Sequence, residues 1–202
     1  MEDWKSFLFP YHQIVDELKI KLRGIRAEFM ELNQRSPIEF VTGRVKPIDS
    51  IKEKMQRRYI DESRIRQDME DIAGLRIICP FIEDIYTVVN LLRQRSDLNI
   101  LEERDYVHNE KASGYRSYHI VFEYTVQGID GPMVLLAEIQ VRTLAMNFWA
   151  TVEHSINYKH QGNFPEVLEK RLQHVADTTY KLDEEMSSIK KELAKYQDNK
   201  ED

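Results

Sequence analysis

The chain has little of what secreted and membrane proteins depend on. Its single cysteine, Cys79, cannot form an internal disulfide and lies in an apolar run, so we expect a buried thiol in a reducing compartment. No apolar stretch approaches the roughly 20 residues that a membrane-spanning helix needs. The N-terminus also lacks the basic start and apolar run of a secretory signal. These absences predict a cytoplasmic protein that does not enter a membrane.

Several common nucleotide-binding and hydrolase motifs are absent as well. The sequence contains no G-x-x-x-x-G-K-[ST], no G-x-G-x-x-G and no G-x-S-x-G segment. Glu153-His154 lacks the spacing and the cysteines that a zinc site requires. If the chain handles ATP, it does so outside the P-loop, Rossmann and kinase schemes.

The charges of the chain are unevenly distributed. A net charge of −6 over 202 residues argues against general affinity for a nucleic-acid backbone. Eight lysines and arginines nevertheless lie between Arg44 and Arg66, whereas acidic residues dominate from Asp183 onward. A basic segment in an acidic protein favours a compact polyanion, rather than a long one, as the ligand.

Hydrophobic periodicity predicts one α+β domain. Apolar residues recur at helical spacing over about 4–32, 47–58, 83–95, 144–158 and 165–196. Runs of β-branched and aliphatic residues predict strands at about 38–45, 75–81, 98–106, 117–126 and 133–143. Asp130-Gly131 predicts a hairpin between the last two strands. This order indicates a single central sheet with helices around it and a helical C-terminal extension.

The last expected strand becomes polar halfway along one face. Its odd positions from Leu135 to Val141 are apolar, whereas the even face changes to Glu138, Gln140 and Arg142. On this strand alone, a solvated face and a functional site are equally good explanations. Asp71, which opens a second apolar run, supplies another carboxylate. Proteins hold Mg²⁺ and triphosphates with paired carboxylates that are surrounded by cations.

Cations gather around the turn at Pro47. Arg44 and Lys46 alternate on the preceding strand, and Ser50, Lys54 and Arg57 share one face of the following helix. Guanidinium and ammonium groups neutralise phosphate charge, so this arrangement predicts a triphosphate pocket. The alternative is an ordinary solvated helix face.

The segment 111–119 combines lysine, glycine, tyrosine, arginine and histidine. Gly114 permits a tight turn before the strand, and Ser117 and His119 share a face that we expect to lie beside Glu138. Tyr115 stands at the mouth of the strand, where its ring can stack on a base. Packing is the alternative role for these aromatic side chains. Asn147, in the first turn of the next helix, is a further ligand candidate.

Five segments together carry a resemblance to a known family. Residues 40–47 (FVTGRVKP), 71–76 (DIAGLR), 113–119 (SGYRSYH), 138–143 (EIQVRT) and 147–150 (NFWA) closely resemble the synthetase domain of the RelA/SpoT family. The resemblance covers nearly the whole chain in order. It is closest to stand-alone small alarmone synthetases of the RelQ type, without the hydrolase half of the larger members.

The resemblance implies a nucleotidyltransferase-like mixed sheet and one reaction. The β,γ-pyrophosphate of ATP passes to the 3′-hydroxyl of GDP or GTP, giving ppGpp or pppGpp and AMP, with no hydrolase activity. Asp71 and Glu138 would hold Mg²⁺, and Glu138 would also take the proton from the 3′-hydroxyl. The implied ATP-binding residues are Arg44, Lys46, Ser50, Lys54, Arg57 and Arg76. The implied GDP- or GTP-binding residues are Lys111, Tyr115, His119, Gln140 and Asn147.

The resemblance also implies domain roles, assembly and regulation. Residues 1–160 would form the synthetase domain and residues 161–202 a C-terminal oligomerisation helix in a homotetramer. A cleft that binds pppGpp as an allosteric activator would be lined by Lys19, Arg23, Arg26, Phe40 and Thr42. Binding of single-stranded RNA stays open. The alternative functions are pyrophosphate transfer onto an RNA 3′ end and non-catalytic regulation through nucleotide or RNA binding.

Overall fold

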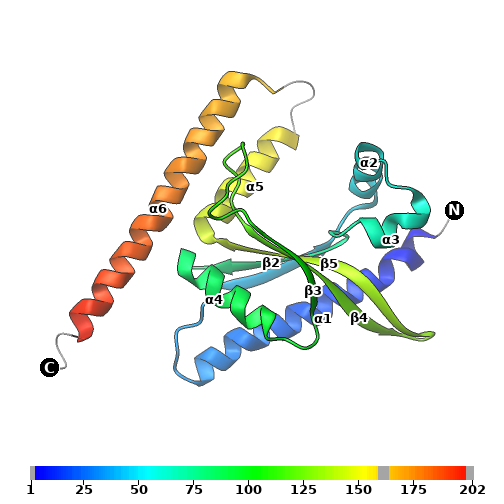
Figure 1. The fold of residues 1–202 in the computed structure, drawn as a ribbon, viewed down its shortest axis with the longest axis horizontal. Coiled ribbons are helices and arrows are strands. Elements are labelled where there is room, and N and C mark those ends of the chain that lie inside the picture. Colours follow the sequence, from blue (N-terminus) through cyan, green and yellow to red (C-terminus); the bar gives the residue numbers. More distant parts are fainter. Residues whose placement is uncertain (1–2, 159–163, 199–202) are drawn as a thin grey trace.

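A five-stranded mixed sheet forms the centre of the computed structural model, which describes residues 3–158 and 164–198. The strands are β1 (Phe40–Val45), β2 (Ala73–Cys79), β3 (Asn99–Asp105), β4 (Tyr118–Gly128) and β5 (Gly131–Thr143). Their order across the sheet is β1-β2-β5-β4-β3 (Figure 1). Among the described strands, only β2 and β5 pair in parallel, and the other pairs are antiparallel. The predicted single sheet and the β4–β5 hairpin are confirmed.

Helices surround this sheet at both ends and on one face. They are α1 (Trp4–Glu31), α2 (Ile48–Arg58), α3 (Ile65–Asp68), α4 (Ile82–Arg93), α5 (Leu144–Tyr158) and α6 (Glu166–Asp198). The five predicted helices are present with bounds close to those expected. The short α3, together with the 3₁₀ turn Glu62–Arg64 before it, was not predicted, because four residues are too few to show a helical period.

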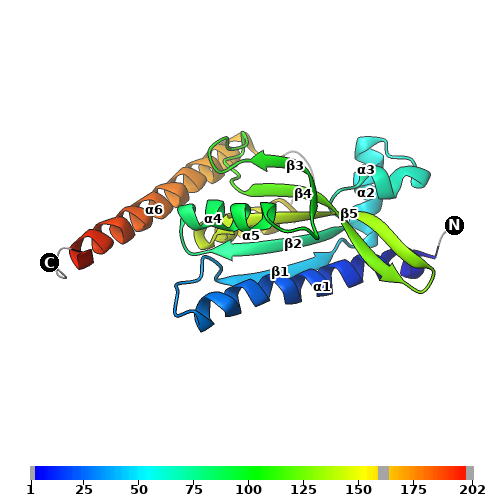
Figure 2. The same cartoon turned by 60° about the horizontal axis from the view of Figure 1, so that its bottom comes forward.

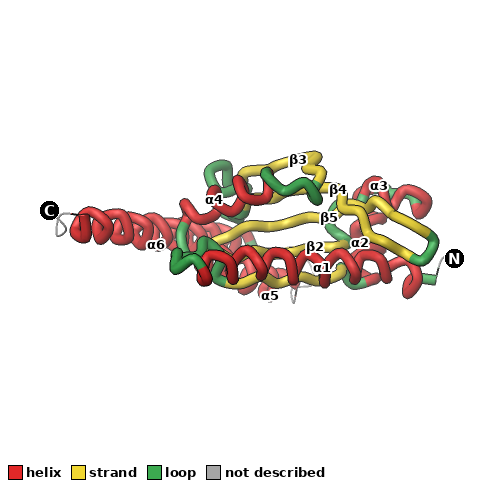
Figure 3. The backbone as a smooth tube through the Cα atoms, turned by 90° about the horizontal axis from the view of Figure 1, so that it is seen from below, coloured by secondary structure: helices red, strands yellow, loops and turns green. Residues whose placement is uncertain are grey.

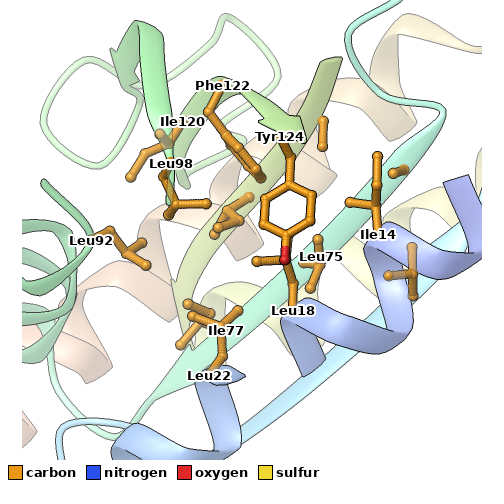
Figure 4. Packing of buried hydrophobic residues seen from close by; sticks show 14 of the residues in the cluster. Ile14, Leu18, Leu22, Leu75, Ile77, Leu92, Leu98, Ile120, Phe122 and Tyr124 are labelled. Atoms are coloured by element: carbon orange, nitrogen blue, oxygen red, sulfur yellow. The ribbon is translucent and has the colours of Figure 1, made fainter. Parts of the chain in front are cut away.

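The main core lies between one face of the sheet and helices α1 and α4. Ile14, Leu18 and Leu22 recur every four residues on α1 and are fully buried. They pack against Leu75 and Ile77 of β2, while Phe122 of β4 lies nearby (Figure 4). Figure 2 shows α1 running along the sheet beneath β1. Because this face takes the apolar half of each strand, the polar half is left to the opposite face.

Strand register brings the polar side chains together on that opposite face. Gly74 of β2 pairs with Arg44 on one side and with Glu138 on the other. Gln140 pairs with Arg76 and with His119. Residues opposite one another in a sheet share a face. Glu138 is only 7% exposed and Arg142 only 3%, so the solvated-face explanation is wrong for this strand.

The residue that follows α2 does not continue the buried face of the helix. Tyr59 lies at helical spacing from Ile51 and Met55, but it is 95% exposed. The helix ends at Arg58, and Tyr59 takes a left-handed conformation with φ of +54°. This change of backbone direction turns its side chain away from the core.

Helix α6 lies beside α5 and α4 and extends beyond the sheet (Figures 1 and 3). Its inner face is buried at Ala176, Asp183 and Ser187, which recur at helical spacing. Its outer face carries exposed apolar residues that include Val175, Leu182, Met186 and Ile189. In the part of the chain that the structure describes, no helix combines the length and apolarity needed to cross a bilayer.

Candidate active site

A cavity of about 240 Å³ opens on the polar face of the sheet. It lies where β1, β2 and β5 are neighbours, beside the loop that leads into β2. Two carboxylates and three cations are among the side chains around it. The lining residues are Thr42, Gly43, Arg44, Lys46, Asp71, Gly74, Leu75, Arg76, Glu138 and Gln140.

Asp71 is held between two lysines. Lys54 Nζ donates to Asp71 Oδ1 at 2.7 Å, and Lys46 Nζ donates to Oδ2 at 3.1 Å. Lys54 reaches Asp71 because it lies one turn after the buried Ile51, on the inner side of α2. Burial alone opposes ionisation of Asp71, but the contacts with Lys54 and Lys46 outweigh it and lower the pKa of the carboxyl. The site therefore holds an ionised carboxylate and two lysines on one edge.

Glu138 is the more buried of the two carboxylates. His119 Nδ1 lies 2.7 Å from Glu138 Oε1, and Gln140 Nε2 donates to Oε2 at 2.8 Å. Burial opposes ionisation, but the contacts with His119 and Gln140 outweigh it, so the pKa of Glu138 is lowered. The negative charge of Asp71 acts in the opposite direction, which shows that the two carboxylates interact.

Glu138 belongs to a closed ring of hydrogen bonds. His119 Nε2 and Tyr115 Oη share a hydrogen bond of 2.8 Å, and Arg142 Nη2 donates to Tyr115 Oη at 2.5 Å. Arg142 Nη2 also donates to Gln140 Oε1 at 2.6 Å, which completes the ring through Gln140 and Glu138. The sequence placed Arg142 on the polar face, but no role was predicted for it. Its alternation with Glu138 and Gln140 was the available signal.

A second arginine stabilises the loop that carries Asp71. Arg104 Nη1 and Nη2 each donate to the Glu70 carboxylate at 3.0 Å. Arg104 lies opposite His119 in the β3–β4 register. Sequence reasoning missed this pair, since nothing in the sequence shows which β3 residue faces the polar side.

The β3–β4 loop, residues 106–117, carries two predicted ligands. Lys111 Nζ lies 5.0 Å from the centre of the Tyr115 ring and 4.5 Å from that of Tyr106. Burial is the main cause of a lowered Lys111 pKa. Asn147 is half-buried in the first turn of α5. The structure thus brings Tyr115 and His119 to Glu138, with Lys111 against the Tyr115 ring.

Most of the other predicted residues are not among the described residues that line this cavity. Ser50 and Arg57 are not among the described residues that line it, and Arg57 is exposed. Arg23 Nη2 donates to the Val41 carbonyl at 3.4 Å, so the basic face of α1 reaches β1. Lys19 pairs with Asp16 at 3.5 Å, while Arg26 and Phe40 are exposed. Thr42, predicted for the allosteric cleft, instead lines the cavity that contains Asp71 and Glu138.

The donor set fits Mg²⁺ that is held partly by a substrate. No group of three or more His, Cys, Asp or Glu side chains forms a metal cluster within residues 3–158 and 164–198. Mg²⁺ prefers oxygen ligands, keeps several waters and is commonly bound by one or two carboxylates together with phosphates. Asp71 and Glu138 at one cavity match that requirement.

Two carboxylates and converging cations on a mixed sheet are typical of α/β enzymes that transfer phosphoryl groups from a nucleotide. The comparisons agree. Residues 43–163 match the model of a region found in RelA/SpoT proteins, and the chain belongs to the RelA/SpoT family. It is 52% identical over 196 residues to GTP pyrophosphokinase YjbM of Bacillus subtilis, covering 97% of this chain and 92% of YjbM.

Two solved structures show the same fold. Small alarmone synthetase 1 from Bacillus subtilis bound to its product pppGpp gives a TM-score of 0.91 at 53% identity, over 94% of this chain and 97% of that one. The same synthetase bound to AMPCPP gives 0.84 at 49% identity, over 95% and 97%. These relatives are small alarmone synthetases, so the predicted family and fold are confirmed.

Proposed function

We propose that this chain is a (p)ppGpp synthetase. It transfers the β,γ-pyrophosphate of ATP to the 3′-hydroxyl of GDP or GTP and releases AMP. The observation that carries this proposal is the pairing of Asp71 and Glu138 at one cavity with Arg44, Lys46 and Arg76. Membership of the RelA/SpoT family and 52% identity to a GTP pyrophosphokinase support it.

ATP occupies the side of the cavity formed by β1, β2 and α2. Arg44 and Arg76 enclose the adenine, since both lie on the polar face of neighbouring strands. When ATP binds, Lys46 and Lys54 leave their ion pairs with Asp71 and contact the phosphate oxygens. Ser50 and Arg57, on the same helix, contact the outer phosphates. Positioning and charge neutralisation of this kind supply most of the catalysis of phosphoryl transfer.

Asp71 and Glu138 would hold Mg²⁺, which would neutralise phosphate charge when bound. Glu138 accepts the proton of the 3′-hydroxyl at a carboxylate oxygen. Its lowered pKa keeps it ionised near neutral pH, and His119 and Gln140 fix its orientation. General-base assistance contributes on the order of 10²–10⁴-fold in rate.

The acceptor nucleotide lies beside the β3–β4 loop. The ring of Tyr115 stacks on guanine, Asn147 contacts the edge of the base, and Lys111 binds phosphate. His119 and Gln140 line the same pocket. Lys111 must move for the base to cover this ring, because its ammonium group lies 5.0 Å from the centre of the Tyr115 ring.

Assembly and regulation follow the same family pattern. The protein acts in the cytoplasm as a homotetramer, with residues 1–160 as the synthetase domain and residues 161–202 as the oligomerisation segment. The exposed apolar stripe of α6 supports this division. Lys19, Arg23, Arg26, Phe40 and Thr42 form the cleft for activating pppGpp. Binding of single-stranded RNA would be electrostatic and should weaken steeply as the salt concentration rises.

A comparison of acceptors tests the proposed function. ATP labelled at its β-phosphate is incubated with GDP, GTP, GMP or total tRNA, in Mg²⁺ and in EDTA. We expect Mg²⁺-dependent label transfer to GDP and GTP with formation of AMP. Label on tRNA alone would instead identify an RNA 3′-end pyrophosphokinase. Nucleotide binding without any transfer would identify a non-catalytic regulator.

A further inference from the structure

The β3–β4 loop rests directly on the first half of α6. Gly114 is buried and has φ of +83°, a left-handed conformation that favours glycine. A Cβ atom added to Gly114 would lie 2.5 Å from Cβ of Ala176 and 3.6 Å from Cα of Gln173. Two small residues therefore allow the main chain of the loop to contact the helix.

Arg116 fixes the same loop one helical turn farther along α6. Its guanidinium carbon lies 3.8 Å from the centre of the Tyr180 ring. Its Nη1 donates to the Val107 carbonyl at 2.5 Å and pairs with Glu110 at 3.3 Å. The Arg116 side chain is only 11% exposed, so this stack is largely removed from solvent. Arg116 thus joins the first part of the loop, at Val107 and Glu110, to one ring on α6.

The residue between these two contacts is Tyr115. Tyr115 packs against a small cluster formed by Trp149 and Ala150 of α5 and Ala176 of α6. Trp149 Nε1 donates to the Leu172 carbonyl at 3.0 Å, which joins α5 to the same part of α6. The inner face of α6 therefore backs the ring that we assign to the acceptor base.

We propose that Arg116, Tyr180 and Ala176 are positioning residues that set the affinity for the acceptor nucleotide. They hold the β3–β4 loop in place before GDP or GTP binds. Less conformational entropy is therefore lost when the nucleotide binds. None of the three is among the described residues that line the ATP cavity. The inference rests on the proposed function, since it assigns the loop to the acceptor.

Tyr180→Leu removes the stacked ring, and Tyr180→Phe is the matched control that keeps it. We expect Tyr180→Leu to raise the KM for GDP on the order of tenfold, the scale of a desolvated cation–π contact, with less than about a twofold change in the KM for ATP. Tyr180→Phe should behave like the wild type. Ala176→Val should also raise the KM for GDP, because it crowds Gly114, whereas Thr178→Val on the exposed face should not.

Amide hydrogen exchange tests the loop independently of activity. The Lys111 amide donates to the Tyr115 carbonyl and the Gly114 amide to the Lys111 carbonyl, so both report on the loop. In Tyr180→Leu they should exchange on the order of tenfold faster, with global melting nearly unchanged. Unchanged exchange, or equal rises in both KM values, would overturn the proposal. Absence of transfer by the wild-type protein would instead overturn the proposed function.

Discussion

At the scale of single residues, Asp71 and its two lysines have opposing roles toward ATP. Lys46 and Lys54 neutralise Asp71 in the nucleotide-free protein and, in our proposal, neutralise phosphate when ATP binds. A carboxylate repels a triphosphate unless a metal lies between them. Asp71 should therefore oppose binding of metal-free ATP and be essential for turnover.

Asp71→Asn and Lys54→Met should consequently separate binding from catalysis. In EDTA, Asp71→Asn should bind ATP as tightly as the wild type or more tightly, whereas Lys54→Met should weaken binding about tenfold or more through loss of a charge-assisted contact. Titration calorimetry measures both. Lys52→Met, on the exposed side of the same helix, is the control and should change affinity little. Equal weakening by Asp71→Asn and Lys54→Met would contradict these roles.

The residue pattern was predictable where it depended on one strand alone. Alternation along β5 placed Glu138, Gln140 and Arg142 together, and alternation along β4 placed His119 on the polar face. The Arg104–Glu70 contact was not predictable, because it depends on the pairing of β3 with β4 and on a loop that passes over the sheet. Local periodicity thus gave the direction of side chains, and only the fold gave their partners.

At the scale of elements, a buried acid joins α6 to the start of α5. Thr143 Oγ1 donates to Asp183 Oδ2 at 2.5 Å and accepts from the Met146 amide at 3.0 Å. Thr143 thereby caps α5 immediately after β5. Burial raises the pKa of Asp183 to about 6, despite the opposing contact with Thr143. Ionised Asp183 therefore costs stability at neutral pH.

Asp183→Asn should stabilise the protein in a pH-dependent manner. Since the folded state holds the proton of Asp183 more tightly than the unfolded chain, its favourable contribution is complete below about pH 4 and is lost as pH rises through about 6. The stability gained by Asp183→Asn should grow across that window and level off at about 3 kcal/mol. Urea unfolding of both proteins from pH 4 to 8 measures it. A difference that is constant with pH would contradict the account.

Elements were predicted well where a long periodic pattern defined them. The 28-residue α1 was recognised from its apolar spacing, and the β4–β5 hairpin from its glycine turn. The role of the inner face of α6 could not be predicted, because Ala176 and Asp183 are not large apolar residues. Their roles depend on contacts with Gly114 and Thr143, which lie far away in the sequence.

At the scale of the whole molecule, the proposed assembly predicts both size and control. The outer stripe of α6 leaves large apolar side chains exposed in one chain, as a self-associating surface does. Light scattering should give a tetramer. The Lys19→Ala/Arg23→Ala double variant should keep basal synthesis and lose stimulation by added pppGpp, because both cations lie on the face of α1 that reaches β1. A monomer, or stimulation that survives the double change, would refute this part of the account.

The most direct test of the central claim is formation of AMP and ppGpp from ATP and GDP by Glu138→Gln. Loss of the ionised carboxylate removes both a proposed Mg²⁺ ligand and the proposed base, so product formation should fall by about 10³-fold or more while the protein stays folded. Glu123→Gln is the control. Glu123 lies on β4, on the same face of the sheet as Glu138, but it accepts a hydrogen bond from Asn99, and this variant should retain normal turnover. Near-normal synthesis by Glu138→Gln would contradict the assignment of this site.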